Sequence, residues 1–405
     1  MNFLFAWRYF KSKKTTNAIN IIAWISVTAI AVVTASLIVV FSVFNGFEDL
    51  VKSLYADFYA DVRVSATKGK IIHLSTQQII QLKKLESVAA VSLVVEEKAL
   101  LMNGDDQSIV VVKGIDESNI SVNNISNHII RGKFNTGTAG SPRLVLGSGI
   151  ESAIRANVES SLTPLVLNLP NKKATKISAE GGFNSYSLYA SGTFAVQQEF
   201  DDKYVFTNLS FLKYMLDMGT DDYSAVEIKL TPNTNTDNTL EALQTLLGKD
   251  FIVETRYQQN KSLYSAMQVE KWIIYGITCL ILTIAAFNII GALTMLVLEK
   301  QKDIAVLKAM GATNNLIKNI FLSEGFLLAI IGGLGGAILA TIICLLQQQF
   351  HLVPLGGSSF LINYYPVKLL LSDYLIVIGT VFVIAILAAY IPSRKASLQS
   401  ISLKS

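Results

Sequence analysis

The sequence has few of the residues that cross-link or catalyse in many small domains. It contains 2 cysteines and 3 histidines in 405 residues, namely Cys279, Cys344, His73, His128 and His351. The histidines lie far apart and no H-E-x-x-H sequence occurs, so we expect no metal site. Both cysteines lie in apolar runs, and the long segment between them and the first apolar run has none. That segment must therefore be stabilised by its hydrophobic core without disulfides.

Motifs for nucleotide binding and catalysis are also absent from the sequence. No phosphate-binding loop of the form G-x-x-x-x-G-K-[ST] occurs, so the chain is not expected to bind ATP itself. No nucleophile, base and orienting residue lie close together in sequence. No patch of basic and aromatic residues suggests nucleic acid. We therefore expect a chain that is not an enzyme, with no catalytic residues and no cofactor of its own.

Charge is scarce: 16% of the residues are charged, 51% are hydrophobic, and the mean hydropathy is +0.44. Four runs contain no Asp, Glu, Lys or Arg, namely 15–47, 272–298, 325–367 and 374–393. Each can hold the roughly 20 apolar residues that cross a hydrocarbon core about 30 Å thick. We predict transmembrane helices at 18–44, 271–298, 322–349 and 370–392. The Pro- and Gly-containing break HLVPLGGSSFLINYYP separates the last two.

Positive charges flank these runs asymmetrically, and Lys and Arg near a membrane are retained in the cytoplasm. The relevant residues are Arg8, Lys11, Lys13 and Lys14 before the first span, Lys300, Lys302, Lys308 and Lys318 between the second and third, and Arg394 and Lys395 after the fourth. We predict that residues 1–17, an amphipathic segment, and the tail 393–405 are cytoplasmic and that 45–270 lie outside. A cleaved signal peptide is the alternative for the first span, whose apolar stretch exceeds the usual 7 to 15 residues.

The large segment 45–270 mixes strand and helix patterns. Alternating or β-branched runs predict strands at 59–66, 88–97, 108–114, 162–169, 186–196 and 223–230, and apolar spacings of three and four predict helices at 76–86, 147–158, 209–218 and 238–248. We predict an α+β domain of two lobes, divided near 130 and 200. An apolar stripe over 47–58 and the helix-compatible segment 256–272 predict helical stalks, with ordinary helix ends at the membrane surface as the alternative.

A short charged stretch, LEKQKDIAVLKAMGAT at 298–313, separates two apolar runs. Ile304, Leu307 and Met310 have the spacing of one helical face, and Gly311 is a natural helix stop. So short a helix is marginal in water and needs a surface to dock on. The residues alone leave two surfaces open: membrane lipid headgroups, with lysines extended toward them, or a groove on a cytoplasmic protein.

This stretch resembles the coupling helix of the FtsX/MacB-type ABC transporter permeases. The residues assigned to it are Glu299, Lys300, Lys302, Asp303, Ile304, Leu307, Lys308, Met310, Gly311 and Ala312. The resemblance implies that the cytoplasmic helix and loop at 299–320 contact a separate ATPase subunit, which binds ATP and Mg. The predicted fold class, four transmembrane helices with a large extracytoplasmic α+β domain between helices 1 and 2, matches the same family.

The N-terminal part is similar to the lipoprotein-releasing permeases LolC and LolE. AWRYFKSKK at 6–14 leads into the first span, which ends in the family's Asn-Gly-Phe-Glu signature at Asn45, Gly46, Phe47 and Glu48. We predict that these four contact cargo, with a helix-ending turn as the alternative. The external segment 144–167 follows the family pattern loosely and departs from it at Glu159, Ser160 and Ser161.

The resemblance implies an inner-membrane permease that passes acylated lipoproteins to a periplasmic carrier. Its partners would be the ATPase, a second permease chain of the same or a related kind, and membrane lipids. Two alternatives remain open at this point. One is a MacB-like efflux permease, and the other is an FtsX-like regulator of a cell-wall hydrolase.

Four further residues are assigned to packing between helices. Gly332 and Gly336 have GxxxG spacing, which favours close helix contact within one chain or across a dimer. Asn288 can form a hydrogen bond across helices. Glu324 is expected to form a structural hydrogen bond with a neighbouring helix, because an unpaired carboxyl group is costly in a bilayer.

Overall fold

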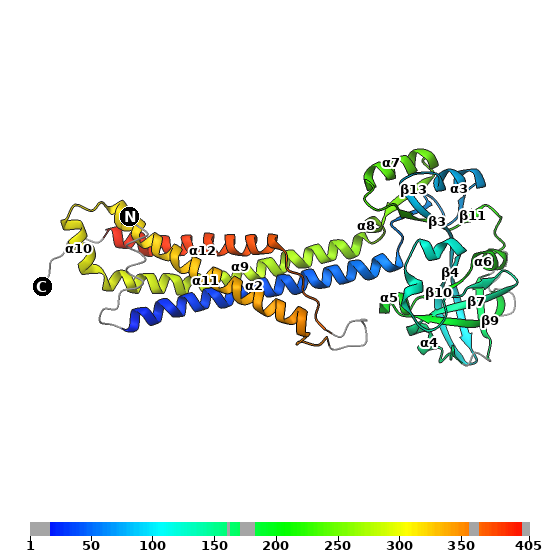
Figure 1. Cartoon of the computed structure of the whole chain (residues 1–405), viewed down its shortest axis with the longest axis horizontal. Helices are drawn as coiled ribbons and strands as arrows, with labels where there is room; N and C mark the ends of the chain where they lie inside the picture. Colours follow the sequence, from blue (N-terminus) through cyan, green and yellow to red (C-terminus); the bar gives the residue numbers. More distant parts are fainter. Residues whose placement is uncertain (1–16, 160–162, 171–182, 356–363, 399–405) are drawn as a thin grey trace. The chain divides into compact units, whose positions relative to one another are not determined.

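The structure is a computed structural model that describes residues 17–159, 163–170, 183–355 and 364–398, without the side chains of residues 17–20, 22, 23, 285 and 288. The chain divides into two compact units (Figure 1). Among the described residues, the helical unit comprises 17–50, 265–355 and 364–398, and the sheet unit comprises 51–159, 163–170 and 183–264. The basic segment predicted at 6–14, residues 160 and 161, and the tail from 399 onward lie outside the described residues.

The helical unit is built from α2 (Asn17–Phe58), α9 (Lys261–Glu299), α10 (Gln301–Ala309), α11 (Asn314–Phe350) and α12 (Leu371–Leu398). Four of these, α2, α9, α11 and α12, are long and apolar enough to cross a membrane, as the charge-free runs predicted. Apolar side chains from all four meet in one core, which includes Ile38, Leu293, Ala329 and Ala389. The chain is therefore a multi-pass membrane protein.

Two helices in this unit extend beyond the spans predicted for them. The stretch 314–320 is not a loop after α10, because α11 begins at Asn314, eight residues before the predicted start at 322. The Thr313 side chain accepts a hydrogen bond from the Leu316 N–H, so an N-cap sets the helix start and not the edge of the apolar run. At the other end of the chain, α12 continues past the predicted end at 392 to Leu398.

The sheet unit contains an 11-stranded sheet with the order β13-β1-β12-β3-β4-β10-β7-β9-β5, in which β6 pairs with β7 and β8 pairs with both β3 and β9. The strands are β1 (Val62–Ala66), β3 (Val88–Asn103), β4 (Asp106–Ile115), β5 (Ile129–Gly132), β6 (Gly137–Thr138), β7 (Ser141–Gly147), β8 (Leu165–Pro170), β9 (Phe183–Phe194), β10 (Tyr204–Asn208), β12 (Ala225–Leu230) and β13 (Phe251–Thr255). The pairs β4–β10 and β7–β9 are parallel. A separate ladder joins β2 (Ile72–His73) to β11 (Asp222–Tyr223).

Short helices connect the strands of this unit. They are α3 (Thr76–Lys83), α4 (Ser148–Ala153), α5 (Gln198–Asp201), α6 (Leu209–Met215), α7 (Thr236–Leu247), α8 (Arg256–Gln259) and the 3-10 helices η1 (Glu117–Ser121) and η2 (Ile125–His128). The predicted helix at 147–158 is too long. α4 ends at Ala153, and Arg155 has a φ of 49°, a left-handed conformation that cannot continue the helix.

The predicted division into two lobes is correct only in part. Residues between 130 and 200 do supply one end of the sheet, through β7, β8 and β9. However, β10 pairs with β7 on one side and β4 on the other, and β8 pairs with β3. The buried apolar side chains likewise form one continuous cluster, from Val62 in β1 to Leu188 in β9. The unit therefore has one sheet and one core.

Candidate functional site

The helix α10 is the first candidate site, and its limits follow from local sequence. Lys300 is the N-cap of α10, and its Nζ lies 3.2 Å from Asp303 Oδ2. Asp303 lies in the first turn of the helix, where the positive end of the helix dipole stabilises an acidic side chain. The helix ends at Ala309, and Gly311 follows with a φ of 92°, a conformation that glycine adopts at little cost. The helix α10 is therefore shorter than the stretch 298–313 from which it was predicted.

One side of α10 is bound to the rest of the helical unit. Ile304 is buried in the apolar core of that unit. The Lys308 ammonium donates a hydrogen bond to the backbone oxygen of Ser397, 2.8 Å away in the last turn of α12. A cation at this position also offsets the negative end of the α12 dipole. Lys308 therefore joins α10 to α12.

The opposite side of α10 is open. Val306 is 59% exposed and Met310 is 79% exposed, and Lys302 is also exposed. Ile304, Leu307 and Met310 were predicted to share one helical face, and in the structure Ile304 is buried, Leu307 is half-buried and Met310 is exposed. Met310 is the C-cap residue, so the helical spacing that would bring it back to that face has already ended. An exposed pair of apolar side chains beside lysines remains as a surface for a partner.

The signature at Asn45–Glu48 is the second candidate site, and it lies inside a helix. α2 continues without a break to Phe58, so the alternative of a helix-ending turn is wrong. The apolar stripe over 47–58 keeps the chain helical past the end of the charge-free run. Asn45 and Gly46 are buried, whereas Phe47 and Glu48 are partly exposed. A contact with cargo at these residues stays a prediction.

Asn45 is held by two charged residues from other helices. Its amide oxygen accepts a hydrogen bond from Lys271 Nζ in α9 at 3.1 Å, and its amide nitrogen donates to Asp373 Oδ2 in α12. Next to it, the backbone N–H of Lys368 donates to the Ser42 oxygen at 2.9 Å. Three helices and the segment before α12 therefore meet around one side chain.

The GxxxG pair packs within this chain. A Cβ atom added at Gly332 would lie 2.7 Å from Ile30 Cβ, and one added at Gly336 would lie 2.4 Å from the Ala31 oxygen. Such distances leave no room for a side chain, so α11 approaches α2 as closely as backbones allow. The question left open by the sequence is answered here by an intrachain contact.

The polar residues assigned to helix packing are Asn288 and Glu324. The side chain of Asn288 lies outside the described residues. Glu324 is buried in α11, and its Oε2 atom has no hydrogen-bond partner in the part of the chain that the structure describes. The expected hydrogen bond to a neighbouring helix is thus not found at this atom.

A buried cluster of charges lies in the sheet unit, where the sequence had not led us to expect one. Lys113 Nζ in β4 lies 2.6 Å from Glu227 Oε1 in β12, and both side chains are 1% exposed. Arg63 in β1 binds Glu96 in β3 through two hydrogen bonds of 2.8 and 3.1 Å. Burial alone would raise the pKa of Glu96, but Arg63 and Lys113 outweigh it and lower that pKa to about 2. The Glu96 carboxyl group is therefore ionised at neutral pH.

Strand register explains this cluster. Arg63 lies opposite Glu227 in the β1–β12 pair, and Glu96 lies opposite Lys113 in the β3–β4 pair. Opposite charges on directly paired residues attract, so the cluster favours this register over a shifted one.

The last turns of α2 pack beside the charge cluster. The Phe58 ring stacks on the Phe200 ring with centroids 4.1 Å apart, and Lys113 Nζ lies 5.5 Å from the Phe58 ring centroid. His128 Nε2 lies 2.9 Å from Asp57 Oδ2. Residues 51–58 of α2, which belong to the sheet unit, are therefore packed within that unit by aromatic and polar contacts.

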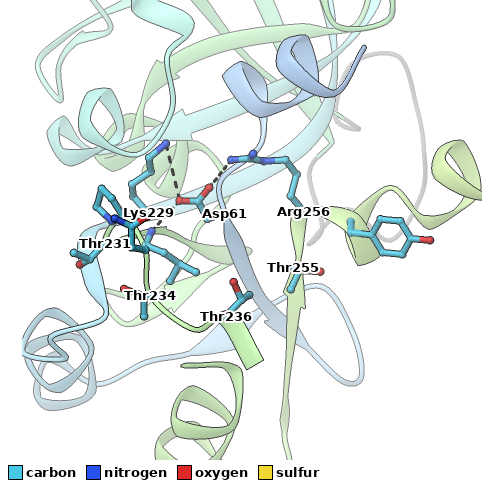
Figure 2. Close-up of a pocket in the computed structure, with 11 residues that line it drawn as sticks. Asp61, Lys229, Thr231, Thr234, Thr236, Thr255 and Arg256 are labelled. Carbon is cyan, nitrogen blue, oxygen red and sulfur yellow. Dashed lines mark hydrogen bonds and ion pairs between the residues drawn. The ribbon is translucent and has the colours of Figure 1, made fainter. Parts of the chain in front are cut away.

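A polar pocket of about 420 Å³ lies where the chain enters and leaves the sheet unit. Figure 2 shows Asp61 between Lys229 and Arg256, with several threonines around them. Asp61 pairs with Arg256 Nη2 at 2.5 Å and accepts from the Leu230 N–H at 2.9 Å. The charged groups of the pocket pair with one another, so we interpret it as a joint between β1, β12 and α8 and assign no ligand to it.

Among the described residues, no group of three His, Cys, Asp or Glu side chains could hold a metal ion. The His128 contact is to a single carboxylate. The features that sequence reasoning missed are all pairings between distant residues. Lys271 and Asp373 had one available signal, because each is the charged residue that borders a charge-free run.

Two family models match this chain. A MacB-like periplasmic core domain matches residues 23–246, which is more than half of the chain, and an FtsX-like permease C-terminal domain matches residues 275–401. The match at 23–246 extends the resemblance through the sheet unit, where the motifs alone were weakest.

The chain is also similar to three permeases over nearly its whole length. The lipoprotein-releasing system transmembrane protein LolC of Xylella fastidiosa is 25% identical over 96% of this chain and 95% of its own. LolC of Neisseria meningitidis is 25% identical over the same shares. The corresponding protein LolE of Haemophilus influenzae is 27% identical over 98% of this chain and 97% of its own. From the two family matches, the chain belongs to the FtsX/MacB-type ABC transporter permeases.

Proposed function

We propose that this chain is the permease subunit of an inner-membrane ABC transporter that releases acylated lipoproteins toward a periplasmic carrier. The observation that carries the proposal is the similarity to permeases named as LolC and LolE, which covers 95% or more of their length. Both the helical unit and the sheet unit take part in that similarity. A shared membrane domain alone would not favour this cargo over others.

The proposed cargo explains why an energy source is needed. Removing an acyl chain from a bilayer costs about 0.8 kcal/mol for each CH₂ group, so a lipoprotein with several chains does not leave at a useful rate unaided. This sequence has no phosphate-binding loop of the P-loop type. ATP and Mg would therefore be bound by a separate ATPase subunit, and this chain would be a non-catalytic membrane subunit.

The contact with that ATPase is assigned to the coupling segment, Glu299–Ala312. Exposed Val306 and Met310 would enter an apolar groove of the ATPase, while buried Ile304 and the bond from Lys308 to Ser397 hold α10 to the helical unit. Movement of the ATPase would then pass through α10 to α9 and α12. The surrounding lysines suit both an acidic groove rim and anionic lipid headgroups.

The orientation proposed here follows the flanking lysines and arginines. α10 and both ends of the chain would lie in the cytoplasm, and residues 51–264 would lie in the periplasm. A second permease chain, of the same or a related kind, would complete the passage for the acyl chains. Of the signature residues, partly exposed Phe47 and Glu48 are better placed than buried Asn45 and Gly46 to contact cargo.

The ATPase assignment is tested by copurification. We expect Met310→Glu to reduce recovery of the ATPase with this chain, because a charge cannot enter an apolar groove without a partner. Tyr214→Glu is the matched control, since Tyr214 in α6 is also 79% exposed. Equal ATPase recovery with both variants would show that α10 is not the docking site.

The cargo assignment is tested by release. Vesicles carrying this chain, its copurified ATPase and partner permease, and a triacylated lipoprotein are given ATP and Mg with a soluble carrier. We expect lipoprotein in the soluble fraction only when ATP is present. ATP hydrolysis without release, together with copurification of a cell-wall hydrolase or an outer-membrane channel, would transfer the chain to the FtsX-like or MacB-like alternative.

A further inference from the structure

The Asn45 amide forms hydrogen bonds with a cation and with a carboxylate at the same time. Lys271 and Asp373 have opposite charges, and the Asn45 amide lies between them. The amide oxygen faces the cation and the amide N–H faces the carboxylate, so one neutral group satisfies both charges. Asn45 is 3% exposed, which removes water as a competing partner for its amide.

Glycine at the next position lets the segment before α12 reach this site. A Cβ atom at residue 46 would lie 2.3 Å from the Pro366 oxygen, so any larger residue would push the segment away. Phe47 packs edge-on against Tyr365, with ring centroids 5.7 Å apart. Lys368 pairs with Asp49 through its side chain. α2 therefore holds the start of α12 through contacts on both sides of Asn45.

The two halves of the bridge differ in burial. Asp373 is 5% exposed and lies in the first turn of α12, where the helix dipole favours a carboxylate. Lys271 is only partly buried. If α9 moved away, Lys271 would gain water while Asp373 kept its hydrogen bond from Asn45. The bond between α9 and α2 is therefore the one that breaks more easily.

The next turn of α9 also contacts α2 and α12. Tyr275, four residues after Lys271, places its ring 6.4 Å from the Phe41 ring in α2. Its hydroxyl group lies 3.1 Å from Thr380 Oγ1 in α12, within hydrogen-bonding distance. Residues four apart share one helix face, so Lys271 and Tyr275 together direct one face of α9 toward α2 and α12.

We infer that Lys271, Asn45 and Asp373 form a releasable polar latch between α9, α2 and α12. The hydrogen bond between Asn45 and Asp373 is kept and holds α2 to α12. The hydrogen bond from Lys271 to Asn45 breaks when α9 separates from α2. The inference rests on the proposed function, in which this chain forms part of the passage for the acyl chains. In that setting the three are positioning residues that keep α9 closed on α2 until cargo enters.

The latch is tested by measuring the distance between α2 and α9 in the assembled transporter in lipid nanodiscs. Spin labels are placed at Val40 in α2 and Val269 in α9, which are both exposed, after replacing Cys279 and Cys344. Double electron–electron resonance then gives the distribution of distances. We expect one narrow distribution for the otherwise unchanged chain and a shift to longer distances with Lys271→Met.

An exchange of the amide and the carboxylate separates the latch from general damage. In Asn45→Asp two carboxylates face each other between α2 and α12, so recovery of folded protein should fall. In Asn45→Asp with Asp373→Asn, the amide introduced in α12 donates to the carboxylate introduced in α2, which Lys271 also faces, so recovery of folded protein should return and the α2–α9 distribution should be narrow. If Asn45→Asp does not fold, recovery of folded protein in the double variant reports the same pairing.

The outcomes distinguish the latch from the proposed cargo. An unchanged distribution in Lys271→Met, or a double variant that behaves no better than Asn45→Asp, overturns the latch. A latch that responds as expected in a transporter that releases no lipoprotein would leave the pairing in place and reject only its proposed use. Lipoprotein release by a transporter whose distance distribution is unchanged in Lys271→Met would support the proposed function and reject the latch.

Discussion

The Lys113 ammonium lies 2.6 Å from the Glu227 carboxylate, with both side chains almost completely removed from solvent. Two charged groups at such a depth are tolerated only while each has a partner, because desolvation costs each of them several kcal/mol. Arg63 and Glu96 extend the cluster across β1 and β3, and Asn119 donates to Glu227 at 3.4 Å. The cluster thus joins four strands from the beginning and end of the unit's sequence.

Lys113→Met should destabilise the sheet unit strongly. The variant leaves the Glu227 carboxylate buried beside fewer cations, and we expect a loss of about 3 kcal/mol in the free energy of unfolding. Hydrogen exchange of the β3 and β4 amides in the full-length chain measures it. Lys70→Met is the control, because Lys70 is 79% exposed and its pair with Glu97 should contribute less than about 1 kcal/mol.

A second variant tests whether the effect comes from the pair. Lys113→Met together with Glu227→Leu removes both charges, and we expect it to be less destabilised than Lys113→Met alone. If the double variant lost as much free energy of unfolding as Lys113→Met and Glu227→Leu lose when added together, the two charges would contribute independently. The pair would then not explain why both charges are buried.

Gly336→Ala should weaken the contact between α2 and α11. The added methyl group would lie 2.4 Å from the Ala31 oxygen, and we expect a cost of about 1 to 3 kcal/mol. Gly335→Ala is a matched control one residue away, because no atom lies within 4 Å of its added Cβ. Alanine favours a helix over glycine by about 1 kcal/mol, so the control should be neutral or stabilising. Thermal unfolding in detergent micelles gives both values, and equal midpoints would contradict the packing.

Asp201 should make the stability of the sheet unit depend on pH. Its burial raises its pKa from 3.8 to about 6, although the N–H groups of Val196 and Gln197 act in the opposite direction. The folded state therefore binds this proton more tightly than the unfolded state does. The free energy of unfolding should fall as pH rises from about 4 to about 6 and remain lower above that range.

Asp201→Asn removes the charge and keeps an oxygen to accept from the Val196 N–H. We expect a gain of up to about 3 kcal/mol at pH 7.5 and little change near pH 4. Hydrogen exchange of the full-length chain at the two pH values measures the difference. Asp105→Asn, at an exposed position, is the control. A variant whose gain is the same at both values would rule out titration of Asp201 as the cause.

Lys308→Met should uncouple ATP hydrolysis from transport. It removes the bond from α10 to Ser397 but leaves exposed Val306 and Met310 in place for the ATPase. We expect ATPase recovery to be unchanged while lipoprotein released per ATP hydrolysed falls. Lys261→Met, which alters an exposed lysine at the start of α9 outside the coupling segment, should change neither. Loss of ATPase binding in Lys308→Met would instead place Lys308 in the docking surface.

The sequence was informative where structure follows from a continuous local pattern. Runs without charge predicted four helices that can cross a membrane, and they are present. Helix ends were less predictable, because they depend on capping and on amphipathic continuation. α11 begins at the Thr313 cap, which the charge-free run did not predict, whereas α2 continues to Phe58 on the apolar stripe that predicted a helix at 47–58.

The polar pairings could not be predicted from the sequence alone. Asn45 is separated by 226 residues from Lys271 and by 328 from Asp373, and no local pattern relates them. Lys113 and Glu227 occupy strands whose charged residues would ordinarily be assigned to the solvent side. Only the strand order, in which β12 lies beside β3, places these charges within one buried cluster.

The position of β1 in the sheet has a consequence for how the protein is made. Val62 pairs with Ile228 on one side and with Thr255 on the other, so both neighbours of β1 come from the far end of the unit's sequence. Such non-local pairing is slow to form. While the chain is being synthesised, β1 has no partner until β12 has emerged, and its exposed edge is open to wrong pairing with other chains. Completion of this unit must therefore wait until synthesis has almost reached α9.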